Sequence, residues 1–370
     1  MTRSLDSEAV DPAEDATDAP RSSNRRARPG RFVFPALAAL VATLFVLELA
    51  IGSIPIPIGD VVRFLLGGEL DNAVWNTILW DLRLPRAIAA LVCGAALGAA
   101  GLQLQTLFRN PLAGPWALGL TGGAELGAAI TIAAGTIVGS AVLAQFEFLS
   151  GLGIVVSAMI GAAAVAAIVA AVSRRVSTMT LLIVGLMLGY LCEGLVSVVM
   201  HFTTEIQGKV FASWSDGSFG GVQWDDFPVL LPSVFVGLAV ALLMVKPLNA
   251  LLLGERYATS LGLPVERARL LTLMGAVILA APVTAYCGPI LFIGIIAPHM
   301  ARGLLNTSDH RVLMPATMLL GAAVTLAADL VVHLPWDRHV LHLNAVNAVV
   351  GAPFVIALLL RNRNMRAMEF

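Results

Sequence analysis

Two carboxylic acids, Glu125 and Glu193, lie inside long apolar stretches of the sequence. A charge at the centre of a bilayer costs about 2.5–3.5 kcal/mol on insertion scales, so such residues usually face a bundle interior or a wet cavity. Both residues could therefore line a pathway for a solute or pair with polar groups. A proton relay would need further titratable groups nearby, and the sequence places none beside either residue. We take both as candidate pathway residues.

The sequence carries no pattern for hydrolysing a nucleotide. Its Gly208-Lys209 pair lacks the upstream glycine and the following Ser or Thr of a phosphate-binding loop. An HExxH helix and a GxSxG elbow are also absent, and His299 has no second histidine four residues later. A membrane-embedded enzyme is the least favoured class. No cofactor is expected to bind this chain directly, and energy from ATP would have to come from another protein.

Cysteines and histidines do not form a metal-binding pattern. The cysteines fall in separate apolar stretches at unrelated spacings, which is typical of small buried residues: Cys93, Cys192 and Cys287. Three histidines lie close together near the C-terminus: His333, His339 and His342. Their spacing matches no compact ligand set, so we predict no metal site.

Composition places these residues in a membrane protein. Hydrophobic residues make up 58% of the chain, charged residues 13%, and the mean hydropathy is +0.85. About ten apolar stretches reach or approach the ~20 residues that span a bilayer as a helix. They lie near 32–54, 87–107, 115–139, 151–172, 180–202, 227–247, 269–287, 289–304, 313–333 and 343–360. The sequence predicts an all-α integral membrane protein, whose eighth span is short and contains Pro298.

The distribution of Lys and Arg sets the orientation. An even number of spans puts both termini on one side, and a cytoplasmic placement leaves all but five of the 23 basic residues inside. The five outside are Arg63, Arg83, Arg86, Lys209 and Arg338. Residues 1–31 combine six acids with a later arginine cluster, which indicates a disordered cytoplasmic tail ahead of a membrane domain over 32–362. The predicted location is the cell membrane.

A cytoplasmic loop over residues 248–269, LNALLLGERYATSLGLPVERAR, is too structured for a simple turn. Its leucines and Tyr257 recur at helical spacing, which predicts two short amphipathic helices broken at Gly262-Leu263-Pro264. Basic residues flank the loop. We interpret it as a docking segment for a cytoplasmic partner.

Small residues recur at four-residue spacing, which lets helix backbones approach closely in lipid. They are Gly94 and Gly98, then Gly119, Gly123 and Gly127, then Gly185 and Gly189. The pattern predicts a tightly packed bundle rather than a site.

Several ordered segments carry a family pattern over roughly residues 35 to 362. They are Arg83-Leu84-Pro85-Arg86, Arg109-Asn110-Pro111-Leu112-Ala113, Leu118-Gly119, Leu253-Gly254-Glu255-Arg256-Tyr257-Ala258 with Leu261-Gly262, Gly288-Pro289-Ile290, Phe292-Ile293-Gly294, Pro298-His299 with Arg302, Asp309-His310-Arg311, Ala328-Asp329 and Gly351-Ala352-Pro353-Phe354. Together they closely resemble the permease subunits of ABC importers for ferric siderophores, haem and cobalamin, the FecCD permease family. The resemblance implies two permease subunits around a central pathway, two ABC ATPase subunits inside and a soluble binding protein outside. Lipid is a further partner, and nucleic acid is not expected.

The resemblance also implies roles for individual residues. The ATPase-docking set is Leu253, Gly254, Glu255, Arg256, Tyr257, Ala258, Leu261 and Gly262. The set facing the binding protein is Arg83 and Arg86, with His333 in the place of a usual arginine. Anchoring in lipid headgroups is the alternative for the two arginines. The cytoplasmic gate positions are Asn110, Leu112, Ser177 and Thr178, although Asn110-Pro111 could simply make a turn.

The last span departs most from the family pattern. Asn344 and Asn347 lie at i,i+3 spacing on one helix face, where they could contact a cargo cavity or a neighbouring subunit. This departure leaves open whether the two permeases are identical. The expected cargo is an iron–siderophore chelate, with haem or cobalamin as alternatives. A secondary transporter driven by protons or sodium would instead show interrupted helices in matched halves, and no such match is visible.

Overall fold

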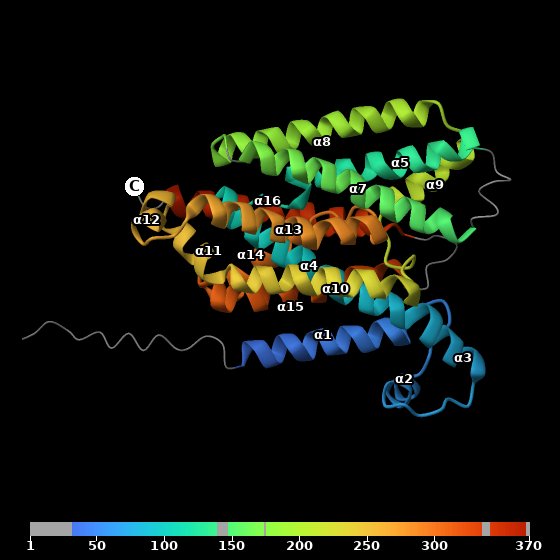
Figure 1. The fold of residues 1–370 in the computed structure, drawn as a ribbon. Helices are drawn as coiled ribbons and strands as arrows, with labels where there is room; N and C mark the ends of the chain where they lie inside the picture. Colours follow the sequence, from blue (N-terminus) through green and yellow to red (C-terminus); the bar gives the residue numbers. More distant parts are fainter. Residues whose placement is uncertain (1–31, 139–146, 174, 335–340, 368–370) are drawn as a thin grey trace, which may run out of the picture.

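The computed structural model describes residues 32–138, 147–173, 175–334 and 341–367. The predicted tail and the positions of Arg174, Arg338 and His339 lie outside the described residues. Regular structure in the described ranges is helical, and the long helices run along one common direction (Figure 1). The first half contains α1 (Val33–Ala50), α2 (Ile58–Leu65), α3 (Ala73–Thr77), the π-helical η1 (Ile78–Arg83), α4 (Leu84–Phe108), η2 (Pro115–Leu118), α5 (Leu120–Val138), α7 (Glu147–Ser173) and α8 (Thr178–His201). The second half contains α9 (Glu205–Ser215), η3 (Trp224–Asp226), α10 (Phe227–Leu243), α11 (Val245–Leu252), α12 (Glu255–Ser260), α13 (Val265–Cys287), α14 (Ile293–Leu305), α15 (His310–Val332) and α16 (Leu343–Ala367).

Each of the ten predicted spans corresponds to a helix. Among the residues that the structure describes, seven helical segments are long and apolar enough to cross a membrane, and shorter apolar stretches lie in α5, α14 and α16. The eighth span is α14, whose 13 residues extend only about 20 Å as α-helix. Left-handed residues limit α14 at both ends, Phe292 with φ 68° and Asn306 with φ 48°. The prediction that this span is short is confirmed.

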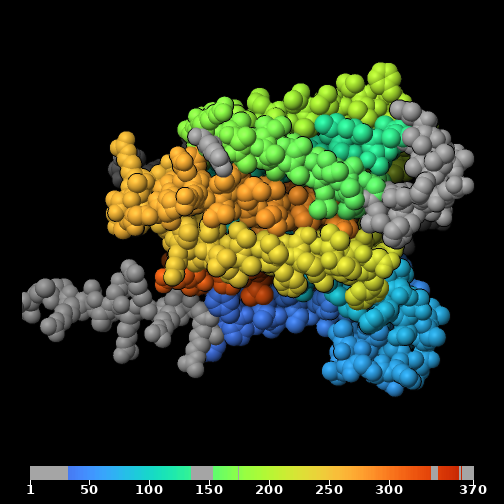
Figure 2. Space-filling view, viewed as in Figure 1, coloured from blue at the N-terminus to red at the C-terminus, as the bar shows by residue number. Residues whose placement is uncertain are grey.

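The two ends of the bundle carry different elements. The start of α1, the short helices α11 and α12, and the end of α16 lie at one end, whereas α2, α3 and α9 lie at the other (Figure 1). In the space-filling view the orange atoms of α12 and its neighbouring residues project from the first end (Figure 2). This arrangement agrees with both termini being on the side of the predicted docking segment.

Helix α4 is the centre of the bundle and packs against α10, α13, α14 and α15. Its glycines explain how closely the backbones approach. A methyl group on Gly98 would lie 2.8 Å from the backbone oxygen of Thr317 in α15, and one on Gly94 would collide with Gly321. Ala or larger residues at these positions would force the helices apart, so the predicted role of the spacing in packing is confirmed.

A second layer is formed by α5, α7 and α8, which lie together in Figure 1. Side chains added at Gly119 and Gly122 would meet the backbone of α8 at Gly189, and one at Gly123 would meet Gly161 of α7. One face of α8 remains uncovered in the single chain, with Met187, Leu191 and their apolar neighbours exposed.

Candidate coupling and gate site

The cytoplasmic loop folds as short helices that are interrupted at the predicted break and also at a second position before it. Helix α11 ends at Leu252, Gly254 follows with φ 113°, and α12 begins at Glu255. A positive φ of this size favours glycine, which explains the earlier break. The turn at Gly262 ends α12, and the residues after Pro264 form the first turn of the long α13 rather than a separate helix. The predicted break at Gly262-Leu263-Pro264 is therefore confirmed, since α12 ends before it and α13 begins after it, and the earlier break at Gly254 was not predicted.

The helix α12 and the residues beside it, which we call the coupling segment (Leu253–Gly262), have an inner and an outer face. Ala258 is buried, as is the neighbouring Leu251, and they hold the segment against the bundle. On the outer face Leu253, Tyr257 and Leu261 are 65%, 52% and 61% exposed. Large apolar side chains that remain exposed beside charged residues such as Arg256 are typical of a surface for a protein partner.

The loop after α4, which carries the predicted gate positions Asn110 and Leu112, is called here the first gate loop. Arg109 caps this helix in the left-handed conformation, with φ 47°. The side-chain oxygen of Asn110 accepts a hydrogen bond of 2.9 Å from the backbone N–H of Leu112, so the Asn110-Pro111 pair does make a turn. Arg109 Nη2 donates to the backbone oxygen of Leu251, 3.1 Å away, and this contact joins the first gate loop to the end of α11.

The loop before α8, which leads into the predicted gate positions Ser177 and Thr178, is called here the second gate loop. Ser177 caps the helix by accepting a hydrogen bond from the N–H of Thr180. The hydroxyl of Thr178 donates to Glu255 Oε1 over 3.1 Å. Arg269, near the start of α13, donates to the backbone oxygen of Val176 over 3.3 Å. The structure thus joins a predicted gate residue directly to a predicted docking residue.

The gate loops and the coupling segment line one cleft of about 670 Å³. Residues that line it include Phe108, Arg109, Ser177, Thr178, Glu255 and Tyr257. Three segments that are far apart along the chain therefore meet at the cytoplasmic end. Sequence analysis did not assign roles to Arg109 and Arg269, although both are arginines that immediately flank predicted gate or docking segments.

A hydrogen-bond network around the buried ring of His310 anchors α11 from the other side. The ring of His310 lies between Thr106 Oγ1, 2.8 Å away, and Asn249 Oδ1, also 2.8 Å away. Asn249 donates to Asp309 Oδ1 over 2.6 Å, and that carboxylate also accepts the backbone N–H of Arg311 at the start of α15. The hydrogen bond from Arg311 is the main cause that lowers the pKa of Asp309 below its usual value of 3.8. The network fixes α11 to α4 and α15.

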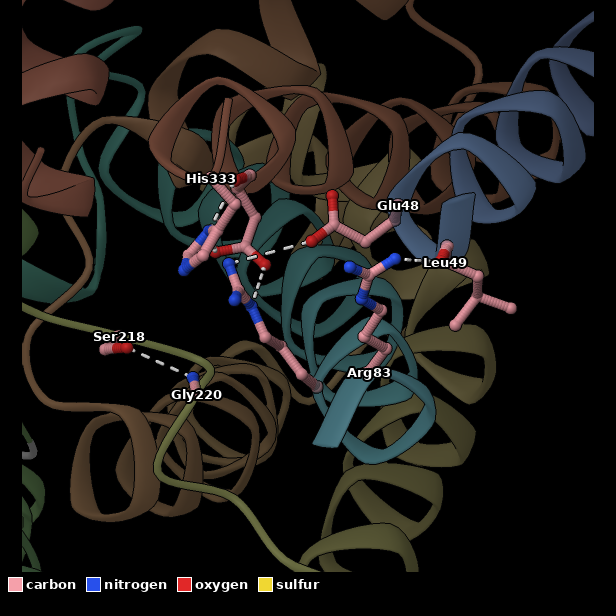
Figure 3. Close-up of polar contacts among 8 residues, drawn as sticks. Glu48, Leu49, Arg83, Ser218, Gly220 and His333 are labelled. Carbon is pink, nitrogen blue, oxygen red and sulfur yellow. Dashed lines mark hydrogen bonds and ion pairs between the residues drawn. The ribbon is translucent and has the colours of Figure 1, made fainter. Parts of the chain in front are cut away.

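At the opposite end of the bundle, Arg86 is held inside the protein. Its Nε donates to Asp329 Oδ2 over 2.7 Å, its Nη2 lies 3.7 Å from Glu48 Oε1, and its side chain is 14% exposed. His333 Nδ1 lies 2.9 Å from the backbone oxygen of Asp329 (Figure 3). Three of these groups, Glu48, Asp329 and His333, are close enough to hold a metal ion. The guanidinium of Arg86 already supplies positive charge among them.

The guanidinium of Arg83 is also hydrogen-bonded within the chain. It donates to the backbone oxygens of Leu49, Ala50 and Ile54, so it closes the turn after α1 (Figure 3). The sequence placed Arg83 and Arg86 outside as docking charges. Their contacts show a structural role for both, and docking to a binding protein remains a prediction.

The candidate pathway residues do not form one cluster. Glu125 on α5 is half-buried and Glu193 on α8 is exposed, and their two helices pack against each other. The side chain of Asn344 is hydrogen-bonded within the chain. Its Nδ2 donates to the backbone oxygen of Pro289 over 2.7 Å, and its Oδ1 accepts from the N–H of Leu291 over 3.1 Å. Asn347 is buried, with its side-chain nitrogen unpartnered among the described residues.

The cysteines are buried and free, as expected from the sequence. Their spacing gave no hint that Cys93 and Cys287 lie together, with 3.7 Å between the two sulfur atoms. A contact between residues 194 positions apart depends on how α4 packs on α13, which cysteine spacing does not encode.

Comparison with known proteins identifies the family. The sequence pattern of the FecCD transport family matches residues 40–361. The chain belongs to this family. It is therefore a permease of an ABC importer, a multi-pass protein of the cytoplasmic membrane, and a transport protein rather than a catalytic enzyme.

Relatives and solved structures agree with this assignment. The vitamin B12 import system permease protein BtuC of Klebsiella pneumoniae is 37% identical over 297 residues, covering 80% of this chain and 86% of the relative. The protein of the same name in Citrobacter koseri is 35% identical, covering 87% of this chain and 94% of the relative. A solved structure described as an inward-facing conformation of a metal-chelate type ABC transporter has a TM-score of 0.77 at 27% identity, covering 89% of this chain and 99% of that one.

Proposed function

We propose that this permease imports a bulky metal chelate, using ATP hydrolysed by a cytoplasmic ATPase that docks on the coupling segment. The observation that carries the proposal is the shared cleft at the cytoplasmic end. There the gate loops touch a segment whose apolar face has no partner in the single chain. A conduit driven by a separate motor needs such a junction between its gate and its motor-binding surface.

A second permease subunit and an extracytoplasmic binding protein complete the proposed assembly. The uncovered face of α8 supports the second subunit, because Glu193 is exposed within it and a charge at that depth does not face lipid. Whether that subunit is identical to this chain is left to the experiment.

Three cargo classes fit the proposal. A ferric siderophore is the expectation from the sequence, and a cobalamin is favoured by the names of the relatives that are 35–37% identical. Haem is a further alternative. All are large chelates, and the binding protein is expected to supply most of the selectivity.

The test of docking uses the full chain and its partner ATPase. Leu253→Asp combined with Tyr257→Asp places two charges on the apolar face, and loss of such buried contacts commonly costs 2 kcal/mol or more, about 30-fold in affinity. Leu66→Asp, which changes an exposed leucine at the opposite end, is the matched control. Equal co-purification of both variants with the ATPase would reject the docking surface.

The test of cargo uses vesicles that contain permease, ATPase and binding protein. Uptake and ATP hydrolysis are measured with cobalamin, ferric hydroxamate, ferric catecholate and haem in turn. One class should stimulate hydrolysis and accumulate inside. Uptake by the permease without ATPase would favour a secondary transporter and overturn the proposal.

A further inference from the structure

Glu255 lies in the coupling segment, yet its carboxylate points to the second gate loop. Oε1 of Glu255 accepts the hydroxyl hydrogen of Thr178 over 3.1 Å, a contact between residues 77 positions apart. Glu255 is the first residue of α12 and follows Gly254, whose φ of 113° sets the direction in which α12 begins. The side chain therefore connects the first turn of α12 to the first turn of α8.

A second contact holds the same loop. Arg269 donates to the backbone oxygen of Val176, two residues before Thr178, over 3.3 Å. Arg269 belongs to the first turns of α13, which directly continues the coupling segment. The loop over residues 176–178 is thus bound at its start by Arg269 and at its end by Glu255. These two residues lie on opposite sides of the turn at Gly262.

We infer that Glu255 and Arg269 are positioning residues that make the second gate loop, residues 176–178, move with the coupling segment. The inference rests on the proposed function, because it assigns a mechanical role within the same importer. It differs from the role expected for Glu255 from the sequence, which was contact with the ATPase.

The strength of the hydrogen bond between Thr178 and Glu255 depends on how exposed the two side chains are to water. Glu255 is exposed and Thr178 is half-buried in the single chain, where water competes for the same hydrogen bond. A partner that covers Leu253 and Tyr257 would exclude water from the adjoining cleft, and hydrogen bonds strengthen in such a low-dielectric setting. The loop would then be tied most firmly when the motor is seated.

Substitution of Thr178 separates positioning from docking. Thr178→Val keeps the shape of the side chain and removes the donor, whereas Thr178→Ser keeps the donor. Glu255→Ala removes the acceptor, and Glu255→Gln keeps an acceptor oxygen without the charge. Thr43→Val is the control for hydroxyl loss, because Thr43 bonds only to the backbone of its own helix.

The measurement is made on the complete complex in vesicles, as cargo molecules taken up per ATP hydrolysed. Loss of one such hydrogen bond should lower this ratio by about threefold to tenfold in Thr178→Val and Glu255→Ala. Affinity for the ATPase should stay within about twofold for Thr178→Val, and Thr178→Ser and Glu255→Gln should recover most of the ratio. The double variant Thr178→Val with Glu255→Ala should be no worse than the poorer single variant.

Two results would overturn the inference. One is that Thr178→Val takes up as many cargo molecules per ATP hydrolysed as the wild-type protein does, in an assay in which the wild-type protein transports cargo. The other is a double variant whose loss equals the product of the two single losses, which would mean that the residues act independently. Failure of the proposed function is distinguishable, since wild-type protein would then show no ATP-dependent uptake at all.

Discussion

Removal of Arg86 distinguishes a structural cation from a docking cation. The guanidinium lies among the carboxylates of Glu48 and Asp329, whose side chains are 4% and 2% exposed. Arg86→Ala would leave both buried acids without the cation that now contacts them. Breaking a buried pair by removing one partner commonly destabilises a protein by about 3–5 kcal/mol. An exposed docking charge would change the free energy of unfolding little, since a surface pair contributes about 0–1 kcal/mol.

The assay is thermal unfolding of the purified full chain in detergent, followed by tryptophan fluorescence. Arg86→Ala should unfold at a markedly lower temperature than wild type. Arg63→Ala is the matched control, because Arg63 makes an exposed pair with Asp71 at 3.6 Å, and its midpoint should scarcely move.

A neutral replacement tests the reason for the loss. Glu48→Gln, Arg86→Met and Asp329→Asn together remove the three ionisable groups at similar volume, and such replacements of buried ion sets are often neutral. The triple variant should therefore unfold at a higher temperature than Arg86→Ala. If Arg86→Ala matches Arg63→Ala in stability while binding-protein affinity falls, Arg86 acts chiefly in docking and the structural argument is refuted.

Three further outcomes follow from the contacts described above. Gly98→Ala should destabilise the bundle by about 1–3 kcal/mol through overpacking against Thr317. Gly194→Ala is the control, because the space around Gly194 is open, and it should not destabilise the protein. The two variants are compared by their thermal unfolding midpoints. Asp309→Ala should cost about 0.5–2 kcal/mol as a lost helix cap. Because the pKa of Asp309 is lowered from 3.8, its contribution is present above that pH and lost as the pH falls through the folded-state value, which an unfolding series across pH would detect. Asn344→Ala should loosen α16 and the segment before α14, and faster hydrogen exchange at Leu291 would report it.

The spans and their order could be predicted because apolar length is a local property of the sequence. Every predicted span is a helix, and even the weakness of the eighth is visible from Pro298 and the short apolar run. The docking segment was found for the same reason, since leucines at helical spacing need only nearby residues. The break at Gly262 was predicted because a proline follows two residues later, whereas the break at Gly254 was missed because no proline marks it and the positive φ of that glycine is not visible in the sequence.

Pairing of charges across the bundle could not be predicted. Arg86 and Asp329 are 243 positions apart, and nothing local to either residue names the other. The rule for orientation counts Lys and Arg residues on each side of the membrane, and the resulting topology placed Arg86 on the outer surface. The same rule is silent on whether a residue at a helix end points into water or into the bundle. For Asn344 the helical face was predicted, but its partners at Pro289 and Leu291 were not.

Packing is close between α4 and α15 and loose around the gate loops, so the two regions should differ in how easily they move. Helices α4 and α15 meet through glycine at backbone distance, and Gly98 admits no added carbon without displacement. The gate loops are held by single side-chain hydrogen bonds, among them those from Arg109 and Thr178, in a cleft open to solvent. Regions with few buried contacts and exposed hydrogen bonds open at lower free energy than a packed core. Motion imposed on α12 would therefore be taken up first by the gate loops, while the α4–α15 contact stays closed.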